Sequence, residues 1–281
     1  MWARRTFPAW LVGATLVAAL LAMPAAATPD PRGSSDNWAG YAAYGTTFRS
    51  VGGEWVQPAA NCFGRSVAST AASFWVGIGG NGPRSTKIEQ IGTESDCDAD
   101  GQPDYYAWYE LWPADGVIIA DSKFHVEPGD KISAHVSVEG TVVALRLENF
   151  TTGDLYADTL TMRAPDLSSA EWIAEAPAVT VHDHDQILPL TDFGTVRFTG
   201  ATATSTHGHT GPVSDPAWRQ QAIDFKSDRA HGRDPVTSFL DTAAAAHGFP
   251  SALLRHGGTF SITWSKGEHL PAKKNLPPGA L

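Results

Sequence analysis

The sequence predicts an all-β protein, an antiparallel two-sheet β-sandwich, on three observations. Helical periodicity is scarce along the 281 residues. Short β-rich runs recur, and glycine, proline, asparagine and aspartate separate them. Their spacing is that of successive hairpins, which is typical of sandwiches. Because no linker or fixed-period repeat divides the chain, we expect one domain over residues 37–265.

The expected strands follow one another from residue 37 to residue 199. They cover 37–45, 53–57, 70–78, 84–94, 104–112, 122–126, 131–138, 141–149, 154–162, 170–176 and 192–199. The strand pattern is weaker after residue 204. We expect a loop over 207–215 and either a strand or a short helix over 218–226. The alanine-rich segment over 238–246 favours a helix. A last strand is expected over 257–264.

The N-terminus reads as an export signal. Arg4 and Arg5 precede an apolar run from Ala9 to Met23, and Ala25-Ala26-Ala27 follows as a small-residue cleavage site. This run is short for a membrane span, and no later stretch approaches one. We therefore expect a signal peptide over 1–27, a disordered lead-in over 28–36, and a secreted, extracellular protein without a membrane partner. Residues 266–281 are expected to form a loose tail.

The charge balance argues against nucleic acid as a partner. The formal net charge is −10, and no basic stripe is visible. Ten histidines, protonated near pH 5, would offset most of this negative charge, which is consistent with a protein that acts in an acidic environment.

The two cysteines are Cys62 and Cys97, and in an oxidising compartment we expect them to pair. If the strands over 70–78 and 84–94 form a hairpin, both cysteines return to the same end of it. A bridge there would contribute about 3–4 kcal/mol through chain entropy.

Alternation along the strand over 170–176 places Glu171, Ile173 and Glu175 on one face. Burying an acid among apolar residues costs free energy unless the acid has a partner or a role in binding or catalysis. The alternative is that both acids face solvent, as most acids do.

Two further strands have one face that suits a groove. Phe74, Val76 and Ile78 share a core face, whereas Trp75 shares the other with Gly77 and Gly79. In the strand over 104–112, one face is aromatic and contains acids; it comprises Asp104, Tyr106, Trp108, Glu110 and Trp112. This face is a candidate binding surface, and the alternative is a core face with edge aromatics.

Several hydrolase signatures are missing, including Gly-x-Ser-x-Gly, His-Glu-x-x-His and the Asp-Thr-Gly or Asp-Ser-Gly of pepsin-type peptidases. The run His182-Asp183-His184-Asp185, with His207 and His209, has metal-ligating side chains but no visible frame, so we interpret it as a solvated loop. Asn149-Phe150-Thr151 is a glycosylation acceptor sequence.

Six segments, taken together and in order, resemble the eqolisins, the secreted glutamic peptidases. They are Asn37-Trp38-Ala39-Gly40, Phe74-Trp75-Val76-Gly77-Ile78-Gly79-Gly80, Ile88-Glu89-Gln90-Ile91-Gly92, Tyr106-Ala107-Trp108-Tyr109-Glu110-Leu111-Trp112-Pro113, Glu148-Asn149-Phe150-Thr151-Thr152-Gly153 and Ala170-Glu171-Trp172-Ile173-Ala174-Glu175. The resemblance covers roughly residues 37–204. It implies a sandwich curved like the concanavalin-type lectins and glucanases.

The resemblance also implies a site. Gln90 and Glu175 match the family's catalytic pair on the concave sheet, and Glu171 does not. The residues expected to line this site and bind substrate are Trp38, Trp75, Glu94, Trp108 and Glu110. The implied activity is an acid-acting endopeptidase that acts on polypeptides, without cofactor or metal, as a monomer.

This chemistry is sensible for peptide hydrolysis, which needs a base for water, an acid for the leaving nitrogen and donors for the oxyanion. One carboxyl can act as base and then as acid. A glutamine amide does not titrate, but its NH₂ can donate to the oxyanion and its C=O can position the water.

Two positions depart from the family pattern. The family usually has an acid where this chain has Gly79, and an aspartate where it has Glu94. The first departure puts in doubt how Gln90 is held.

Two other functions remain open on the sequence. Glu171 and Glu175 have the spacing of the paired carboxyls of laminarinase-type glycosidases, although Ile173 replaces the middle acid. A module that binds carbohydrate or protein without catalysis would use Trp38, Trp75, Trp108 and Trp112 as a platform.

Overall fold

The computed structural model describes residues 32–62, 69–82, 85–181, 184–226, 246–254 and 256–266. This part of the chain contains strands and no helix, so the all-β prediction is confirmed. Within these ranges, no helix has the length and apolarity that crossing a bilayer requires. The expected signal peptide and the tail after Lys266 lie outside the described residues.

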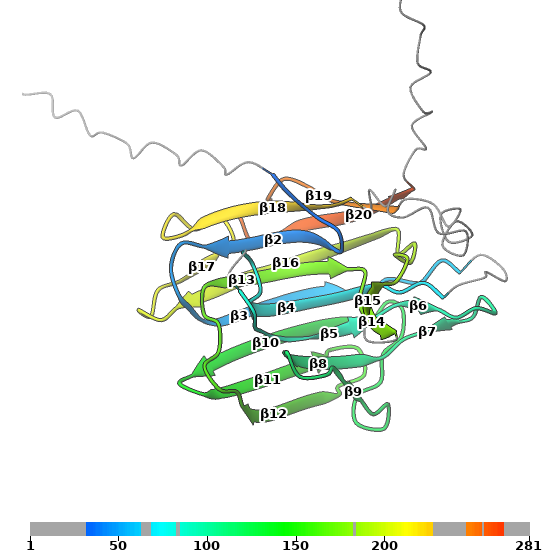
Figure 1. The fold of residues 1–281 in the computed structure, drawn as a ribbon, viewed down its shortest axis with the longest axis horizontal. Helices are drawn as coiled ribbons and strands as arrows, with labels where there is room; N and C mark the ends of the chain where they lie inside the picture. The colour runs from blue at the N-terminus through cyan, green and yellow to red at the C-terminus, as the bar shows by residue number, and fades with distance from the viewer. Residues whose placement is uncertain are drawn as a thin grey trace, which may run out of the picture.

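The strands form two layers (Figure 1). The first layer contains, in spatial order, β9 (Val117–Ile119), β8 (Ala107–Trp112), β5 (Ile88–Glu94), β4 (Ser73–Gly79), β13 (Ser169–Glu175), β2 (Trp38–Tyr44), β18 (Arg219–Lys226), β19 (Ala246–Pro250) and β20 (Phe260–Lys266). The second contains β12 (Leu155–Thr161), β11 (Val142–Asn149), β10 (Lys131–Glu139), β3 (Phe48–Val56), β16 (Thr195–Ser205) and β17 (Thr210–Pro212).

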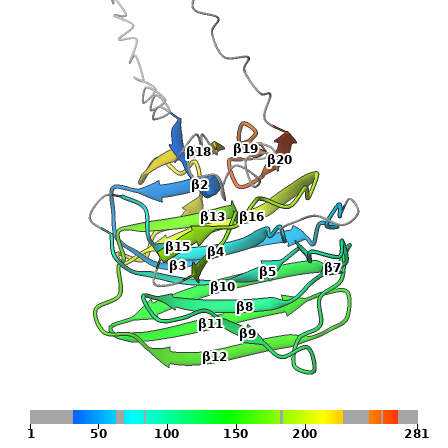
Figure 2. The same cartoon turned by 45° about the vertical axis from the view of Figure 1, so that its right-hand side comes forward.

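Strand β16 joins the two layers. Its first residues, up to Phe198, pair with β20, and from Thr199 onward it pairs with β3, with a register shift between Thr199 and Thr202. A bulge of this kind bends a strand, so one strand can belong to both sheets. Figure 2 shows β10 and β11 overlapping β5 and β8, and both β10 and β11 are in contact with β5.

The core lies between the layers and follows the predicted alternation. Phe74, Val76 and Ile78 on β4 are fully buried in it, as are Val143 and its inward neighbours on β11. Arg146 and Glu148 on the outer face of β11 form an ion pair with 2.7 Å between Nη2 and Oε2. The inner faces of both sheets are therefore assigned correctly by period-two alternation.

Several segments differ from the expectation or decide between alternatives. The loop expected over 207–215 contains the short strand β17, which pairs with β16. Residues 122–126 form no strand: the chain turns there, with Lys123 N donating to Ala120 O, and buries Phe124 in the core. The strand in this region is β9, which ends at Ile119, before the segment expected to form a strand. Strands β14 (Ala178–Val181) and β15 (His184–Ile187) pair antiparallel, although His182-Asp183-His184-Asp185 is expected to be a solvated loop. The segment over 218–226 is strand β18, and the helical expectation over 238–246 lies mostly outside the described residues.

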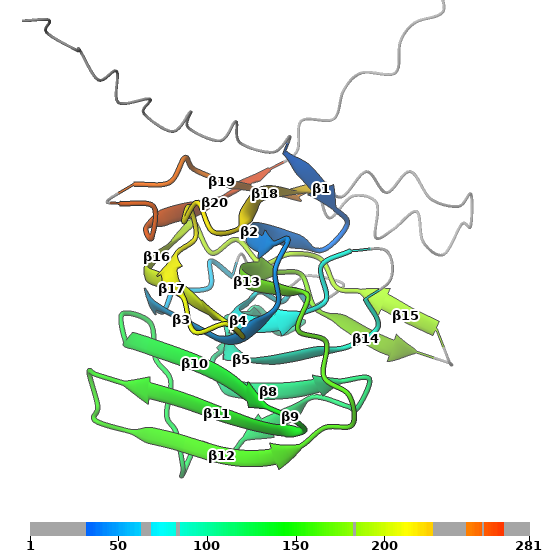
Figure 3. The same cartoon turned by 90° about the vertical axis from the view of Figure 1, so that its left-hand side faces the viewer.

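The lead-in over 28–36 is also ordered in part, because residues 33–35 form strand β1 (Gly33–Ser35), which pairs in parallel with β18. An ion pair fixes its start: Arg32 Nη2 lies 2.5 Å from Asp224 Oδ1 and donates to Pro250 O as well. Figure 3 shows β1 passing beside β2 and β18. A polar composition predicted disorder here, whereas the free edge of β18 and a buried carboxylate order the segment.

The predicted disulfide is present: Cys62 and Cys97 are bonded, with their Cα atoms 5.6 Å apart. Strands β4 and β5 form the expected hairpin, and short strand β6 (Asp96–Cys97), which pairs with β7 (Pro103–Asp104), follows it. The bridge ties the segment that precedes β4 to the end of this hairpin.

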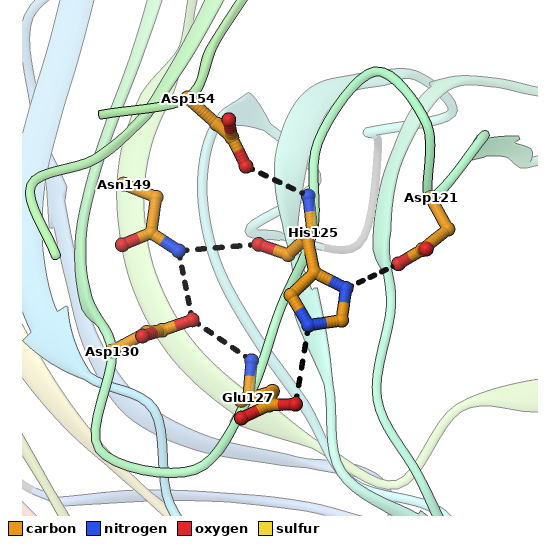
Figure 4. Close-up of polar contacts among 6 residues, drawn as sticks. All are labelled: Asp121, His125, Glu127, Asp130, Asn149 and Asp154. Atoms are coloured by element: carbon orange, nitrogen blue, oxygen red, sulfur yellow. Dashed lines mark hydrogen bonds and ion pairs between the residues drawn. The ribbon is translucent and has the colours of Figure 1, made fainter. Parts of the chain in front are cut away.

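The side chain of Asn149, in the glycosylation acceptor sequence, has a structural role. Asn149 is fully buried, and its Nδ2 donates to Asp130 Oδ2 at 2.8 Å and to His125 O at 3.1 Å (Figure 4). Its Oδ1 accepts from the backbone N–H of Thr151 at 2.9 Å. The side chain therefore holds the loop before β10 against the turn after β11, and in the folded protein its amide is not free to carry a glycan.

Candidate active site

Strand register brings the two expected catalytic residues to one face of the first layer. Gln90 on β5 is paired with Gly77 of β4, and Glu175 on β13 is paired with Ser73 of β4. Since Gly77 and Ser73 are four residues apart on one strand, they share a face. Gln90 and Glu175 therefore both open into a groove of about 690 Å³.

Glu175 is partly buried at the floor of this groove, and donors surround its carboxyl group. Asn37 Nδ2 donates to Oε1 at 2.7 Å, and the indole N–H of Trp75 donates to Oε2 at 2.8 Å. Burial raises the pKa of Glu175 to about 7, and hydrogen bonds from Trp75, Trp38 and Asn37 act in the opposite direction. The carboxyl can therefore exchange a proton near neutral pH.

Gln90 is almost fully buried, and its amide is held from one side only. Its Nε2 donates to Glu110 Oε2 at 2.5 Å, which fixes the orientation of the amide because a carboxylate oxygen accepts only from the NH₂ end. Its Oε1 is buried and has no hydrogen-bond partner among the described residues. A buried amide oxygen without a partner is unusual and is available to a bound water or substrate.

The other predicted groove residues divide into two groups. Trp38, Glu94, Trp108 and Glu110 line the groove. Trp75 does not, because it is fully buried in a small apolar cluster with Ala42, Ile88, Ile173 and Ile223. Its indole reaches Glu175 from beneath, and Trp38 packs on it with ring centroids 5.0 Å apart, so direct contact of Trp75 with substrate stays a prediction.

Glu94 and Asp96 form a second pair of acidic side chains, next to Glu175. Burial, together with the charges of Asp96 and Glu175, raises its pKa well above the usual range. Burial also raises the pKa of Asp96 to about 6, although it accepts a hydrogen bond from Tyr106 Oη at 3.0 Å. Sequence reasoning found Glu94 but missed Asp96 and Asn37, since neither follows a strand periodicity that points to the groove.

The structure explains why position 79 is a glycine. Gly79 has a φ of +83°, and a Cβ there would lie 2.7 Å from the carbonyl oxygens of Asp166 and Lys87. Only glycine tolerates both constraints. Asp166, from the loop before β13, fills this space, accepts a hydrogen bond from Ser85 Oγ, and Ser85 lines the groove. The acid usual at this position in the family could not be accommodated here.

Glu171 is fully buried and has no hydrogen-bond partner for either carboxyl oxygen among the described residues. Burial raises its pKa well above the usual range. It does not line the groove, so it cannot act with Glu175 on a sugar. The glycosidase interpretation is therefore wrong for this structure.

The expected solvated histidine loop is described only in part. His182 and Asp183 lie outside the described residues, and His209 pairs with Asp215 at 2.9 Å between Nε2 and Oδ1. No group of three or more histidine, cysteine, aspartate or glutamate side chains is arranged to hold a metal ion in the part that the structure describes.

Comparison with known proteins places this all-β chain among the glutamic peptidases. A family model described as the Peptidase A4 family matches residues 36–231, and the chain belongs to this family, the eqolisins. It is 34% identical over 200 residues to aspergillopepsin-2 of Aspergillus niger, covering 63% of this chain and 67% of that protein. The protein is thus a peptide hydrolase, and the interpretation as a non-catalytic binding module is wrong.

Solved structures show the same fold. Scytalido-glutamic peptidase with a transition state analog inhibitor matches with a TM-score of 0.63 at 24% identity, over 82% of this chain and 99% of that one. SCP-B, an eqolisin in complex with the tripeptide Ala-Ile-His, matches with a TM-score of 0.61 at 24% identity and the same coverage.

Proposed function

We propose that this glutamic peptidase hydrolyses polypeptides with Glu175 as general base and then general acid, and with Gln90 as the oxyanion donor. The observation that carries the proposal is the state of the Gln90 amide. One N–H is held by Glu110, which leaves the second N–H for an oxyanion and the unpartnered Oε1 for a water. A charge-neutral donor of this kind works at any pH.

The carboxyl group of Glu175 has room for one further partner. An ionised carboxylate has about four acceptor sites, and hydrogen bonds from Asn37 and Trp75 occupy one on each oxygen. An open site would accept the proton of the attacking water while the water oxygen bonds to the scissile carbonyl carbon. The C–N bond then breaks, and the same carboxyl gives its proton to the leaving nitrogen.

Two effects bound the working pH. Below its pKa of about 7, Glu175 is increasingly protonated in the free enzyme, so the carboxylate that activates water becomes the minority form. Above neutral pH, buried carboxyls such as Glu89, whose pKa burial raises to about 8, ionise and weaken the fold. The protonated carboxyl is needed in the second half of the reaction, where the leaving nitrogen takes its proton, and this step is favoured at lower pH. We therefore infer that the enzyme works on the acidic side of neutrality, close enough to the pKa of Glu175 for both of its forms to be populated.

We also infer that the protein is secreted and acts outside the cell as a monomer on unfolded or extended polypeptides. The basic, apolar and small-residue segments over 1–27 support export. The disulfide between Cys62 and Cys97 supports an oxidising compartment.

Digestion of an unfolded protein over a series of pH values tests this function. We expect cleavage at internal peptide bonds, greatest below pH 7, and the same rate with and without pepstatin because no aspartate pair forms the site. Strong pepstatin inhibition, or cleavage that increases steadily above pH 8, would contradict the proposal.

A further inference from the structure

The segment that leads into β2 contacts the carboxyl group of Glu175 through a short chain of polar side chains. Ser35, the last residue of β1, donates from Oγ to Asn37 Oδ1 at 3.0 Å. Asn37 Nδ2 in turn donates to Glu175 Oε1 at 2.7 Å. All three residues line the groove.

Each group in this chain has its hydrogen-bonding roles fixed. The Ser35 hydroxyl has one proton, given to Asn37, and its two lone pairs accept from the backbone N–H groups of Asn37 at 3.3 Å and Trp38 at 3.1 Å. With its oxygen bound to Ser35, the amide of Asn37 presents its NH₂ to Glu175. A flipped amide would set two oxygens against each other at Glu175 and two donors against each other at Ser35.

The chain rests on an anchored support. Strand β1 pairs with β18 through Gly33, Ser34 and Ser35, and Arg32 binds the buried carboxylate of Asp224. The side chains of Ser35 and Asn37 are therefore held before substrate arrives, which is what precise placement of a catalytic carboxyl requires.

We propose that Asn37 is a positioning residue of the peptidase reaction, which holds Glu175 as an oriented carboxylate, and that Ser35 fixes Asn37 for this task. The inference rests on the proposed role of Glu175. A hydrogen bond to the charged form of an acid favours that form, so Asn37 extends the pH range in which Glu175 is a base.

The other groups around Glu175 carry either no charge or a negative one. Trp38 on β2 and Trp75 on β4 are uncharged, whereas Glu110 on β8 and Glu94 on β5 are acids whose ionisation would oppose that of Glu175. Asn37 and the two indoles counter this repulsion. Loss of Asn37 should therefore move the acidic limb of the activity profile to higher pH.

The test compares kcat, KM and the pH profile of kcat/KM for Asn37→Ala, Asn37→Asp and Ser35→Ala, with Ser137→Ala as the control, because Ser137 lies on strand β10 and does not line the groove. We expect Asn37→Ala to lower kcat by about 10- to 100-fold, the equivalent of a hydrogen bond to a charged group, with a smaller change in KM. Asn37→Asp should shift the acidic limb upward by about one pH unit, because a second carboxylate replaces the donor. Ser35→Ala should shift it in the same direction, and Ser137→Ala should leave it unchanged.

The outcomes separate this proposal from the proposed function. Wild-type kcat and pH profile in both Ser35→Ala and Asn37→Ala, with Glu175→Gln inactive, would overturn the role of Asn37 and leave the catalytic pair intact. Activity retained in Glu175→Gln would overturn the proposed function itself. Because Ser35→Ala leaves Asn37 in place, it decides the matter even if Asn37→Ala does not fold.

Discussion

Glu175→Gln is expected to lower kcat/KM by about 10³-fold or more while the protein remains folded. The substitution keeps the size of the side chain and can keep one of the two hydrogen bonds, from Trp75 or from Asn37, because an amide has a single acceptor oxygen. It removes the group that takes and returns the proton. Loss of general acid–base catalysis accounts for about 10²- to 10⁴-fold. The measurement is the steady-state rate on an unfolded protein or peptide at the optimum pH of the wild-type enzyme.

Glu171→Gln is the matched control for this variant. It makes the same substitution four residues earlier on the same strand, at a carboxyl that is fully buried and does not line the groove. We expect it to retain wild-type turnover. If the two variants lost activity equally, the assignment of Glu175 would be wrong, because the effect would then follow from any change to this strand.

The second large effect is a loss of stability as pH rises from 4.5 to 8. Burial raises the pKa of Glu89 to about 8, so the folded state keeps a proton that the unfolded state releases above pH 4.5. The free energy of unfolding therefore falls through this window, by about 5 kcal/mol for Glu89 alone as an upper bound. Glu171 and Glu94, whose pKa values burial also raises, add to the same trend.

Denaturant unfolding at pH 4, 6 and 8 measures this trend. Wild-type protein should be most stable at pH 4, and Glu89→Gln should flatten the curve because an amide cannot ionise. The midpoint of unfolding for Glu89→Gln should thus exceed that of the wild type at pH 8. Equal stability of the wild type at pH 4 and pH 8 would show that these carboxyls are not held protonated by the fold.

Much of the fold could be predicted from local patterns because the two sheets obey period-two alternation. The inward faces of β4 and β11 are visible in the sequence, and so is the placement of Glu175 on a strand beside Ile173. The short edge strand β9 and the hairpin of β14 and β15 were not predicted, because three or four residues carry too little pattern. Their positions depend on the strands beside them.

The site was harder to predict where its residues act through one another. Trp75 reads as a groove wall because it alternates with two glycines, yet it lies beneath the groove and holds Glu175. Asn37 begins the expected strand over 37–45 and one of the segments that resemble the eqolisins, but no local pattern indicates that its side chain contacts Glu175. Gly79 reads as a lost acid, and only the three-dimensional contact with Asp166 shows that a side chain there would not fit.

The central claim is that Gln90 and Glu175 act as one unit although they are 85 positions apart in the chain. A double-mutant cycle of kcat/KM with Gln90→Ala, Glu175→Gln and the double variant tests it most directly. Residues that act as a unit are strongly non-additive, so we expect the double variant to be about as slow as Glu175→Gln alone. Losses that multiply in the double variant, or a Gln90→Ala variant with wild-type activity, would contradict the claim.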